Sequence, residues 1–179
     1  MASSLFCVVS NSDSKQNSKE NSKVHTYFIE PTQAYFDKFG REFIDQICPK
    51  YSYGHLNKLA ICRIYQFDNE VHITHFNNYV REYYIQNKQK FSNDIYKGLG
   101  TLLLKNILQY MVNLDSNILD NKIYLDMVNT KNKKLVKFYE SLSFVLYDED
   151  NFLSTIRDVM HKLQDYFICN ILYIIFTTI

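Results

Sequence analysis

The sequence predicts an α/β domain in which a mixed sheet carries helices on its faces. Three observations point to this fold class. Short runs rich in β-branched and aromatic residues alternate with longer amphipathic segments along the chain. Two of these runs, 59–67 and 71–76, flank the turn residues Asp68-Asn69, which predicts an antiparallel hairpin. The runs 80–85 and 122–128 flank a long helical segment, which predicts two parallel strands joined by a right-handed crossover.

The first half of the chain is expected to begin with a strand at 23–30 and a helix at 31–47. Pro31 suits the first turn of that helix, Gly40 can divide it, and Cys48-Pro49 ends it. Strands at 59–67, 71–76 and 80–85 come next. The second half is expected to contain a helix at 99–113, a strand at 122–128, a helix at 130–142, a strand at 144–147, a helix at 152–163 and a strand at 166–176.

Length and composition indicate one globular domain behind a polar tail. The chain has 179 residues, 46% of them hydrophobic and 22% charged, which is enough apolar material for a real core. Residues 10–23 are polar and low in complexity. We therefore expect residues 1–23 to be disordered or weakly ordered and residues 24–179 to form a single domain. The short apolar run 5–9 can dock as an extra strand, which the sequence does not decide.

The charge limits the binding partners that can be expected, and the cysteine spacing indicates the redox compartment. The net charge is +1 without a basic stripe, so neither nucleic acid nor an anionic membrane is expected. The four cysteines show no C-x-x-C spacing and predict buried thiols in a reducing compartment. The apolar run 167–179 is too short to span a bilayer. The apolar run 5–9 has no basic residue before it, so a secretory signal is not expected. We expect a soluble cytoplasmic protein, either a monomer or a homodimer joined at its apolar last strand.

The segment 92–113 passes through a tight Gly98-Leu99-Gly100 turn into a leucine-rich helix. Two glycines at a helix entrance let the backbone approach a ligand and aim its free N–H groups at it. These amides and the positive end of the helix dipole form an anion site suited to phosphate. Taken alone, the motif is better explained as a loop-to-helix turn that required small residues.

A second segment downstream changes that balance. The loop motif is Ile95-Tyr96-Lys97-Gly98-Leu99-Gly100, and the downstream segment NTKNKKLVKFYESLSF contains Asn132, Phe138, Tyr139, Glu140, Leu142 and Phe144. Together they resemble the GNAT superfamily, the Gcn5-related N-acetyltransferases. The phosphate loop of that family reads Arg or Gln, two residues, Gly, one residue, Gly or Ala, and its later motif is similar to Asn, two residues, Ala, then FYEKLGF. Glu82-Tyr83-Tyr84-Ile85 also resembles the fourth-strand segment of the family. The resemblance covers about residues 80–147.

The resemblance implies a mostly antiparallel, twisted sheet with a central parallel pair that splays, formed here by 80–85 and 123–128. The pantetheine arm of acetyl-CoA would lie in the gap between these two strands. Main-chain amides of Tyr84 and Ile85 would hold the cofactor and polarise its thioester carbonyl. The remaining cofactor contacts implied are Ile95, Tyr96, Lys97, Gly98, Leu99, Gly100 and Thr101 at the pyrophosphate, and Asn132 at the pantetheine arm. Asn132 can equally serve as a helix cap.

The implied reaction is direct transfer of the acetyl group from acetyl-CoA to a primary amine in a ternary complex. An amine with a pKa of about 10.4 needs roughly 4.6 kcal/mol to be neutral at pH 7, so a base is required. Glu82 is the expected base, with a solvent-facing strand residue as its alternative reading. Tyr139 is the expected acid for the departing thiolate, with simple core packing as its alternative. The acceptor is a small amine, a peptide or a protein.

Among the departures from the family pattern, one supports another function. Ile95 occupies the place of Arg or Gln, Leu135 that of the small Ala, and Ser143 that of Gly. Ile95 removes a polar contact to the pyrophosphate and favours a catalytically silent GNAT-fold binding module as the alternative. No metal is expected, because His72 and His75 are three positions apart on a strand and should point to opposite faces.

Two charged segments, one basic and one acidic, are further candidates for ligand contacts. The lysines Lys131, Lys133 and Lys134 surround a helix start, where they can meet a cofactor phosphate or form a solvated face. The acidic run 148–150 can attract a cationic acceptor or form a surface turn.

Overall fold

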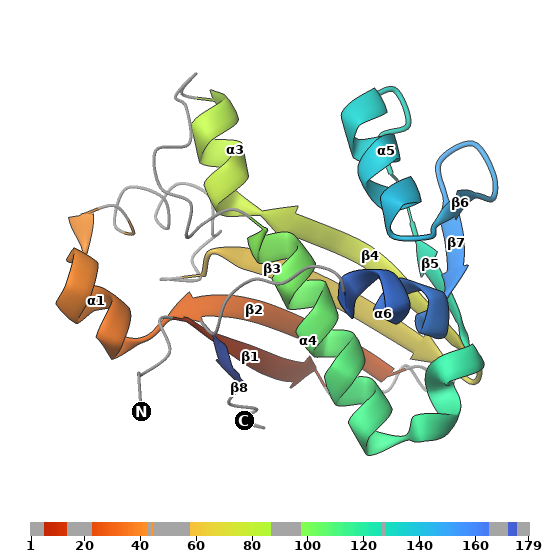
Figure 1. Ribbon diagram of the computed structural model, residues 1–179, viewed down its shortest axis with the longest axis horizontal. Helices are drawn as coiled ribbons and strands as arrows, with labels where there is room; N and C mark the ends of the chain where they lie inside the picture. The colour runs from red at the N-terminus through yellow and green to blue at the C-terminus, as the bar shows by residue number, and fades with distance from the viewer. Residues whose placement is uncertain are drawn as a thin grey trace.

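The computed structural model describes residues 6–13, 23–42, 44, 58–86, 98–126, 128–164 and 172–174. The described strands are β1 (Phe6–Asp13), β2 (Lys23–Pro31), β3 (Ala60–Phe67), β4 (Glu70–Asn78), β5 (Lys122–Leu125), β6 (Val145–Leu146), β7 (Phe152–Thr155) and β8 (Leu172–Ile174). They form one sheet in the order β6-β7-β5-β4-β3-β2-β1-β8 (Figure 1). Neighbours are antiparallel except β4–β5 and β1–β8, which are parallel. The predicted α/β class with a mixed, mostly antiparallel sheet is confirmed.

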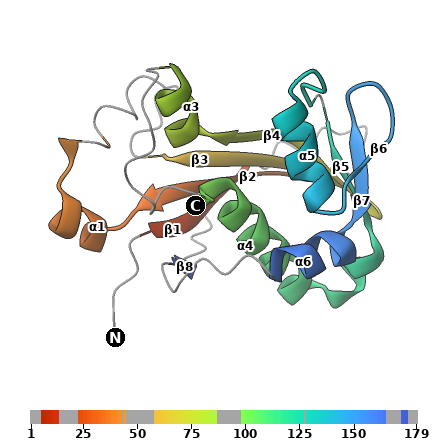
Figure 2. The same cartoon turned by 45° about the horizontal axis from the view of Figure 1, so that its top comes forward.

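The described helices are α1 (Gln33–Phe39), α3 (Tyr79–Gln86), α4 (Leu99–Leu114), α5 (Lys133–Ser141), α6 (Ile156–Gln164) and the short 3₁₀ helix η2 (Ser116–Asp120). Figures 1 and 2 show α4 and α6 together over one face of the sheet, while α1 and α3 continue from the ends of β2 and β4. Helices over the other face stay a prediction. Within the described residues, the helices are too short or too polar to cross a membrane.

The helix α4 confirms the prediction for 99–113 and supplies much of the core. Its inward residues recur at helical spacing and are fully buried, namely Leu103, Leu104, Ile107 and Leu108. They pack over β2, β3 and β4. The predicted hairpin is also confirmed, with β3 and β4 joined by Asp68-Asn69. The helix α4 is thus anchored firmly enough to hold its N-terminus at a fixed place.

Residues 6–13 are a strand, which contradicts the disorder expected for 10–13 and agrees with the alternative that the apolar run 5–9 docks as an extra strand. They form β1, which pairs with β2 from Phe6 opposite Pro31 to Asp13 opposite Val24. Phe6 and Val8 point to the same side of the strand and are fully buried. The apolar start therefore anchors β1, and backbone bonds to β2 order its polar continuation. Residues 1–5 and 14–22 lie outside the described residues.

The predicted strand at 80–85 is wrong, because these residues belong to α3. The side-chain oxygen of Asn78 accepts a hydrogen bond from the Arg81 amide at 3.1 Å, as a helix cap does. Tyr79 and Val80 are buried and Tyr83 packs against the core, which is helical spacing. The parallel crossover therefore starts from β4 instead. Its pairing with β5 runs from Glu70 opposite Lys122 to Ile73 opposite Leu125.

The C-terminal elements also differ from the expectation. The predicted helix at 152–163 divides into strand β7 and helix α6. Phe152 and Ser154 are paired with β5 and face the core, and α6 begins at a reciprocal cap between Thr155 and Asp158. Of the predicted strand at 166–176, the structure describes Leu172–Ile174 as β8, parallel to β1.

Candidate functional site

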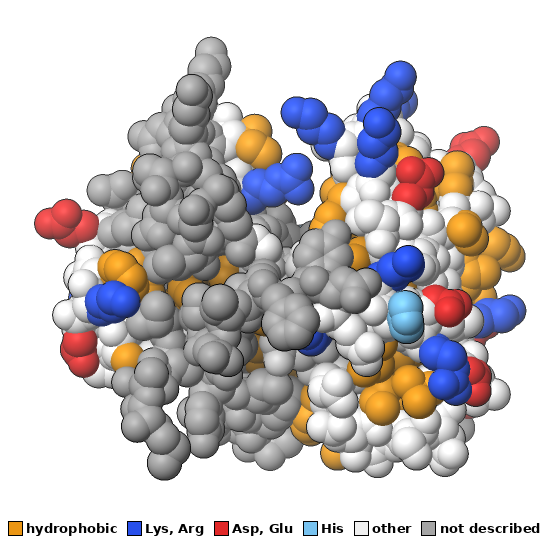
Figure 3. Space-filling view, viewed as in Figure 1, with side chains coloured by type: hydrophobic (Ala, Val, Ile, Leu, Met, Phe, Trp, Pro, Cys, Tyr) orange, Lys and Arg blue, Asp and Glu red, His pale blue; other side chains and the backbone are white. Residues whose placement is uncertain are grey.

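A groove of about 510 Å³ opens where β4 ends, between α3, the start of α4, and α5. Figure 3 shows this side of the molecule hollowed, with Lys and Arg side chains on both sides of the hollow. The groove is lined by His75, Phe76, Asn77 and Asn78 of β4, by Arg81, Glu82 and Ile85 of α3, by Gly98, Gly100 and Thr101, and by Asn132, Leu135, Phe138 and Tyr139. The two segments that resemble family motifs therefore meet at one groove.

The start of α4 contributes its backbone to the groove. Gly98 caps the helix with a φ of 75°, a left-handed conformation that favours glycine. A Cβ added at Gly100 would lie 3.2 Å from Cζ of Phe76, so this helix turn rests closely on β4. Leu99 is buried in the core and is not among the residues that line the groove. The amides of the first turn have no helical partner. Ile95, Tyr96 and Lys97 lie outside the described residues.

The side chain of Tyr139 lines the groove and is 5% exposed. Its ring contacts those of Phe138, Phe144 and Phe152 at centroid distances of 5.3, 6.1 and 5.9 Å. Burial raises the pKa of the phenol to about 12, Cys62 adds to this, and Arg81 acts in the opposite direction. The phenol is therefore protonated at pH 7. Tyr139 both packs in the core and faces the site.

Asn132 has the capping role that the sequence left open. Its side-chain oxygen accepts a hydrogen bond from the Leu135 amide at 3.2 Å, at the start of α5. It also lines the groove. The carboxamide oxygen is engaged with the helix, so a contact to a ligand would come from the amide nitrogen.

The prediction that main-chain amides of Tyr84 and Ile85 hold the cofactor from a strand is wrong. Both residues are inside α3, where main-chain amides bond to carbonyls of the same helix. Ile85 instead reaches the groove with its side chain, which is 64% exposed. Glu82 also lines the groove, but from the first turn of α3 and not from a strand. Its role as a base stays a prediction.

Beyond Ile73 the strand β4 keeps its partner on one side only. Its pairing with β3 continues to Asn78, whereas β5 ends at Leu125 and the last link is the Asp126 amide to the Ile73 carbonyl at 3.0 Å. Within the described residues, no strand pairs with 74–78 on the side away from β3. As far as the described residues go, the main-chain groups of 74–78 on this side are available to a ligand that binds along the strand.

A second cavity of about 200 Å³ lies at this separation. It shares His75, Phe76, Leu135 and Tyr139 with the groove, and it adds Ile73, Thr74, Leu125, Asp126, Val128 and Asn129. Because four residues line both spaces, the groove and the second cavity are neighbours, and Tyr139 lines each of them.

The prediction that His72 and His75 point to opposite faces is wrong. A bulge adds Thr74 to β4, so that Tyr65 is opposite His72 and Arg63 is opposite His75. Arg63 and Tyr65 are two apart on β3 and share a face, and so do the two histidines. Even so, among the described residues no group of His, Cys, Asp and Glu has the arrangement of a metal site.

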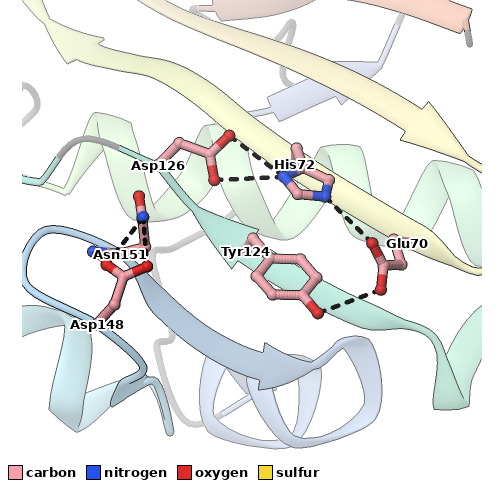
Figure 4. Close-up of polar contacts among 6 residues, drawn as sticks. All are labelled: Glu70, His72, Tyr124, Asp126, Asp148 and Asn151. Carbon is pink, nitrogen blue, oxygen red and sulfur yellow. Dashed lines mark hydrogen bonds and ion pairs between the residues drawn. The ribbon is translucent and has the colours of Figure 1, made fainter.

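His72 belongs to a polar cluster on that face (Figure 4). Its Nδ1 lies 3.3 Å from both carboxylate oxygens of Asp126, and its Nε2 lies 3.4 Å from Oε2 of Glu70. The hydroxyl of Tyr124 donates to Oε1 of Glu70 at 3.2 Å. Partial burial and the nearby Glu70 raise the pKa of that phenol. The cluster links the second cavity, through Asp126, to the protein surface.

Sequence reasoning missed the end of β4 (75–78), Arg81 and Asp126 as site residues. One signal was present for the first two: Asn78 followed by Tyr79 and Val80 reads as a helix cap, which would have ended the strand at the groove. No sequence signal marked Asp126, because its partners come from another strand.

The acidic run 148–150 forms a surface turn, which is one of the two alternatives that the sequence left open. The carboxylate of Asp148 accepts hydrogen bonds from the amides of Asp150 and Asn151 and from the Asn151 side chain. Figure 4 shows this pair beside the cluster around His72. These bonds hold the pKa of Asp148 below its usual value.

Stability should fall on mild acidification because of His75. Burial and Arg63 lower the pKa of this ring, against a smaller opposing effect of Glu82. The unfolded chain thus binds the proton more readily, and stability is lost as the pH falls through about 6.5. Burial and Lys23 act in the same direction on His25. We expect the melting temperature to decrease from pH 7.5 to 5.5, and His75→Asn to flatten this decrease. A pH dependence unchanged in His75→Asn would contradict the assignment.

Comparisons with known proteins found no match for this chain: no family model, no curated protein and no solved structure is similar to it.

Proposed function

We propose that the protein is an N-acetyltransferase that binds acetyl-CoA in the groove and transfers the acetyl group to a primary amine. One observation carries the proposal. Gly98 and Gly100 at the start of α4, and Asn132 and Tyr139 at α5, are far apart in the sequence yet line the same groove. These are the two segments whose resemblance to GNAT motifs implied a cofactor site. The groove volume of about 510 Å³ suits a ligand of this size.

The pyrophosphate is proposed to bind at the first turn of α4. Its unpartnered amides and the helix dipole attract anions, and they need no side chain at Ile95 to do so. Arg81 lines the same groove. Lys131, Lys133 and Lys134 are exposed at the start of α5 and add positive charge nearby. These cations favour a polyanionic ligand.

The pantetheine arm and the thioester are proposed to lie along the unpaired edge of β4. Main-chain groups of 74–78 replace Tyr84 and Ile85 in this role. An amide-bearing arm can bond there as an added strand would. A main-chain amide beside the thioester carbonyl would stabilise the oxyanion that forms when the amine attacks. Tyr139, protonated at pH 7, would then give its proton to the thiolate of CoA.

The first test is thermal unfolding with acetyl-CoA, free CoA or ATP. A ligand at about a hundred times its Kd adds roughly 2.7 kcal/mol to the free energy of unfolding. For a domain of this size we expect the melting temperature to rise by about 5–10 °C with either coenzyme and not with ATP. No rise at millimolar coenzyme would contradict the proposal and leave the silent GNAT-fold binding module.

A further inference from the structure

The second cavity has the properties of a site for a small cation. Asp126 is the carboxylate among its lining residues, and its side chain is 24% exposed. The other described walls are apolar or neutral at pH 7, and the lowered pKa of His75 keeps that ring uncharged. A volume of about 200 Å³ has room for a short aliphatic chain.

The carboxylate of Asp126 is connected to a path that leads out of the cavity. Nδ1 of His72 faces both oxygens of Asp126, and Nε2 on the other side of the ring faces Glu70. The ring is held in this orientation by Tyr124, stacked at 4.5 Å and 12°, and by the edge contact of Phe67 at 5.5 Å. The Glu70 side chain is 44% exposed and reaches solvent.

We propose that the acceptor of the N-acetyltransferase is a narrow primary aliphatic amine, which enters the second cavity as its ammonium ion and loses its proton to Asp126. His72 is the positioning residue that passes this proton to Glu70. The inference rests on the proposed function, because it needs the thioester to lie beside the second cavity. It assigns the base role to Asp126 in place of Glu82, which lines the groove but not the second cavity.

The ammonium gives one proton to the Asp126 carboxylate, the proton moves to Nδ1 of His72, and the proton on Nε2 moves to Glu70 and then to water. The neutral amine attacks the thioester carbonyl carbon, forming a C–N bond. The C–S bond then breaks, and CoA leaves with the second amine proton, delivered through Tyr139. The net reaction converts an ammonium ion and acetyl-CoA to an amide, CoA and one released proton.

Several groups face this path. Glu70 and Asp126 are on either side of His72, Tyr124 is stacked on it, and Tyr65 is opposite it on β3. His75 lines the same cavity as Asp126. A carboxylate lies within 3.3 Å of Nδ1 and another within 3.4 Å of Nε2, so each ring nitrogen of His72 has a partner for proton exchange.

The test compares two amines, n-butylamine, which is an ammonium ion at pH 7, and trifluoroethylamine, which is already neutral there. Asp126→Asn and His72→Asn are assayed for acetyl-CoA-dependent acetylation of each amine. With n-butylamine we expect kcat/KM to fall about 100-fold in Asp126→Asn and at least about 10-fold in His72→Asn. With trifluoroethylamine each variant should match the parent, because no proton must be removed beforehand. The loss with n-butylamine should shrink as the pH rises.

Three controls make the outcome decisive. The melting-temperature rise with acetyl-CoA should persist in both variants, and Asp158→Asn, a change outside both cavities, should match the parent. If the parent shows no such rise, the proposed function itself fails. The relay is overturned if the rise is present but kcat/KM falls equally for both amines in the Asp126 and His72 variants. It is also overturned if Glu82→Gln, and not these variants, loses kcat/KM with n-butylamine alone. A parent that binds acetyl-CoA but acetylates neither amine overturns the substrate class.

Discussion

Replacing Tyr139 with phenylalanine is expected to lower kcat at least about 100-fold while the melting temperature stays close to that of the parent. The hydroxyl would protonate the departing thiolate, whereas the ring supplies the packing against Phe138, Phe144 and Phe152. Phenylalanine keeps the ring and removes only the proton donor. The variant therefore separates the two roles that the sequence could not distinguish.

The measurement is steady-state acetylation at saturating acetyl-CoA, together with thermal unfolding. Tyr147→Phe is the matched control, because Tyr147 is 63% exposed and lines neither cavity. It should leave kcat unchanged. If Tyr139→Phe also turned over at the parental rate, the thiolate would be protonated by water, and Tyr139 would be a packing residue only.

Replacing Gly100 with leucine is expected to abolish the acetyl-CoA-dependent rise in melting temperature, which corresponds to a loss of affinity of more than about 100-fold. The added Cβ would lie 3.2 Å from the Phe76 ring, and the remaining atoms would occupy the groove beside the amides that are proposed to hold phosphate. The fold should survive, because leucine favours a helix by roughly 0.8 kcal/mol over glycine and offsets part of the crowding.

The experiment is a titration of acetyl-CoA followed by thermal unfolding and by calorimetry. Gly100→Ala is the graded variant, since it adds the Cβ alone and asks Phe76 to move by a few tenths of an ångström. Gln109→Leu, exposed on the same helix, controls for the new apolar side chain. Undiminished binding by Gly100→Leu would place the phosphates elsewhere and remove the role proposed for the start of α4.

The elements that the sequence predicted well are those whose local pattern and tertiary role agree. The helix α4 has an apolar face at helical spacing and buries that face, and the β3–β4 hairpin has a two-residue turn between alternating runs. The strand prediction for 80–85 failed because aromatic and β-branched residues in this segment favour a strand. The Asn78 cap and the burial of Tyr79 and Val80 make it a helix instead.

The site was predictable only in part for the same reason. Gly98, Gly100, Asn132 and Tyr139 could be found because each belongs to a motif with a fixed local spacing. Asp126 could not, since its importance depends on His72, a residue from a different strand whose position follows from the β4–β5 register. The extension of β1 to Asp13 was missed because this polar half is ordered by pairing with β2 and not by its own composition.

The bulge at Thr74 makes the number of residues in β4 as important to the site as their identity. Alternation along a strand has a period of two, so one inserted residue inverts the parity of all positions after it. If Thr74 were paired as in a regular strand, with no bulge, Phe76 would turn away from Gly100, and the imidazole of His75 would enter the layer beneath α4. The bulge therefore lets the first half of β4 place its side chains for the core, while the second half places its side chains along the groove.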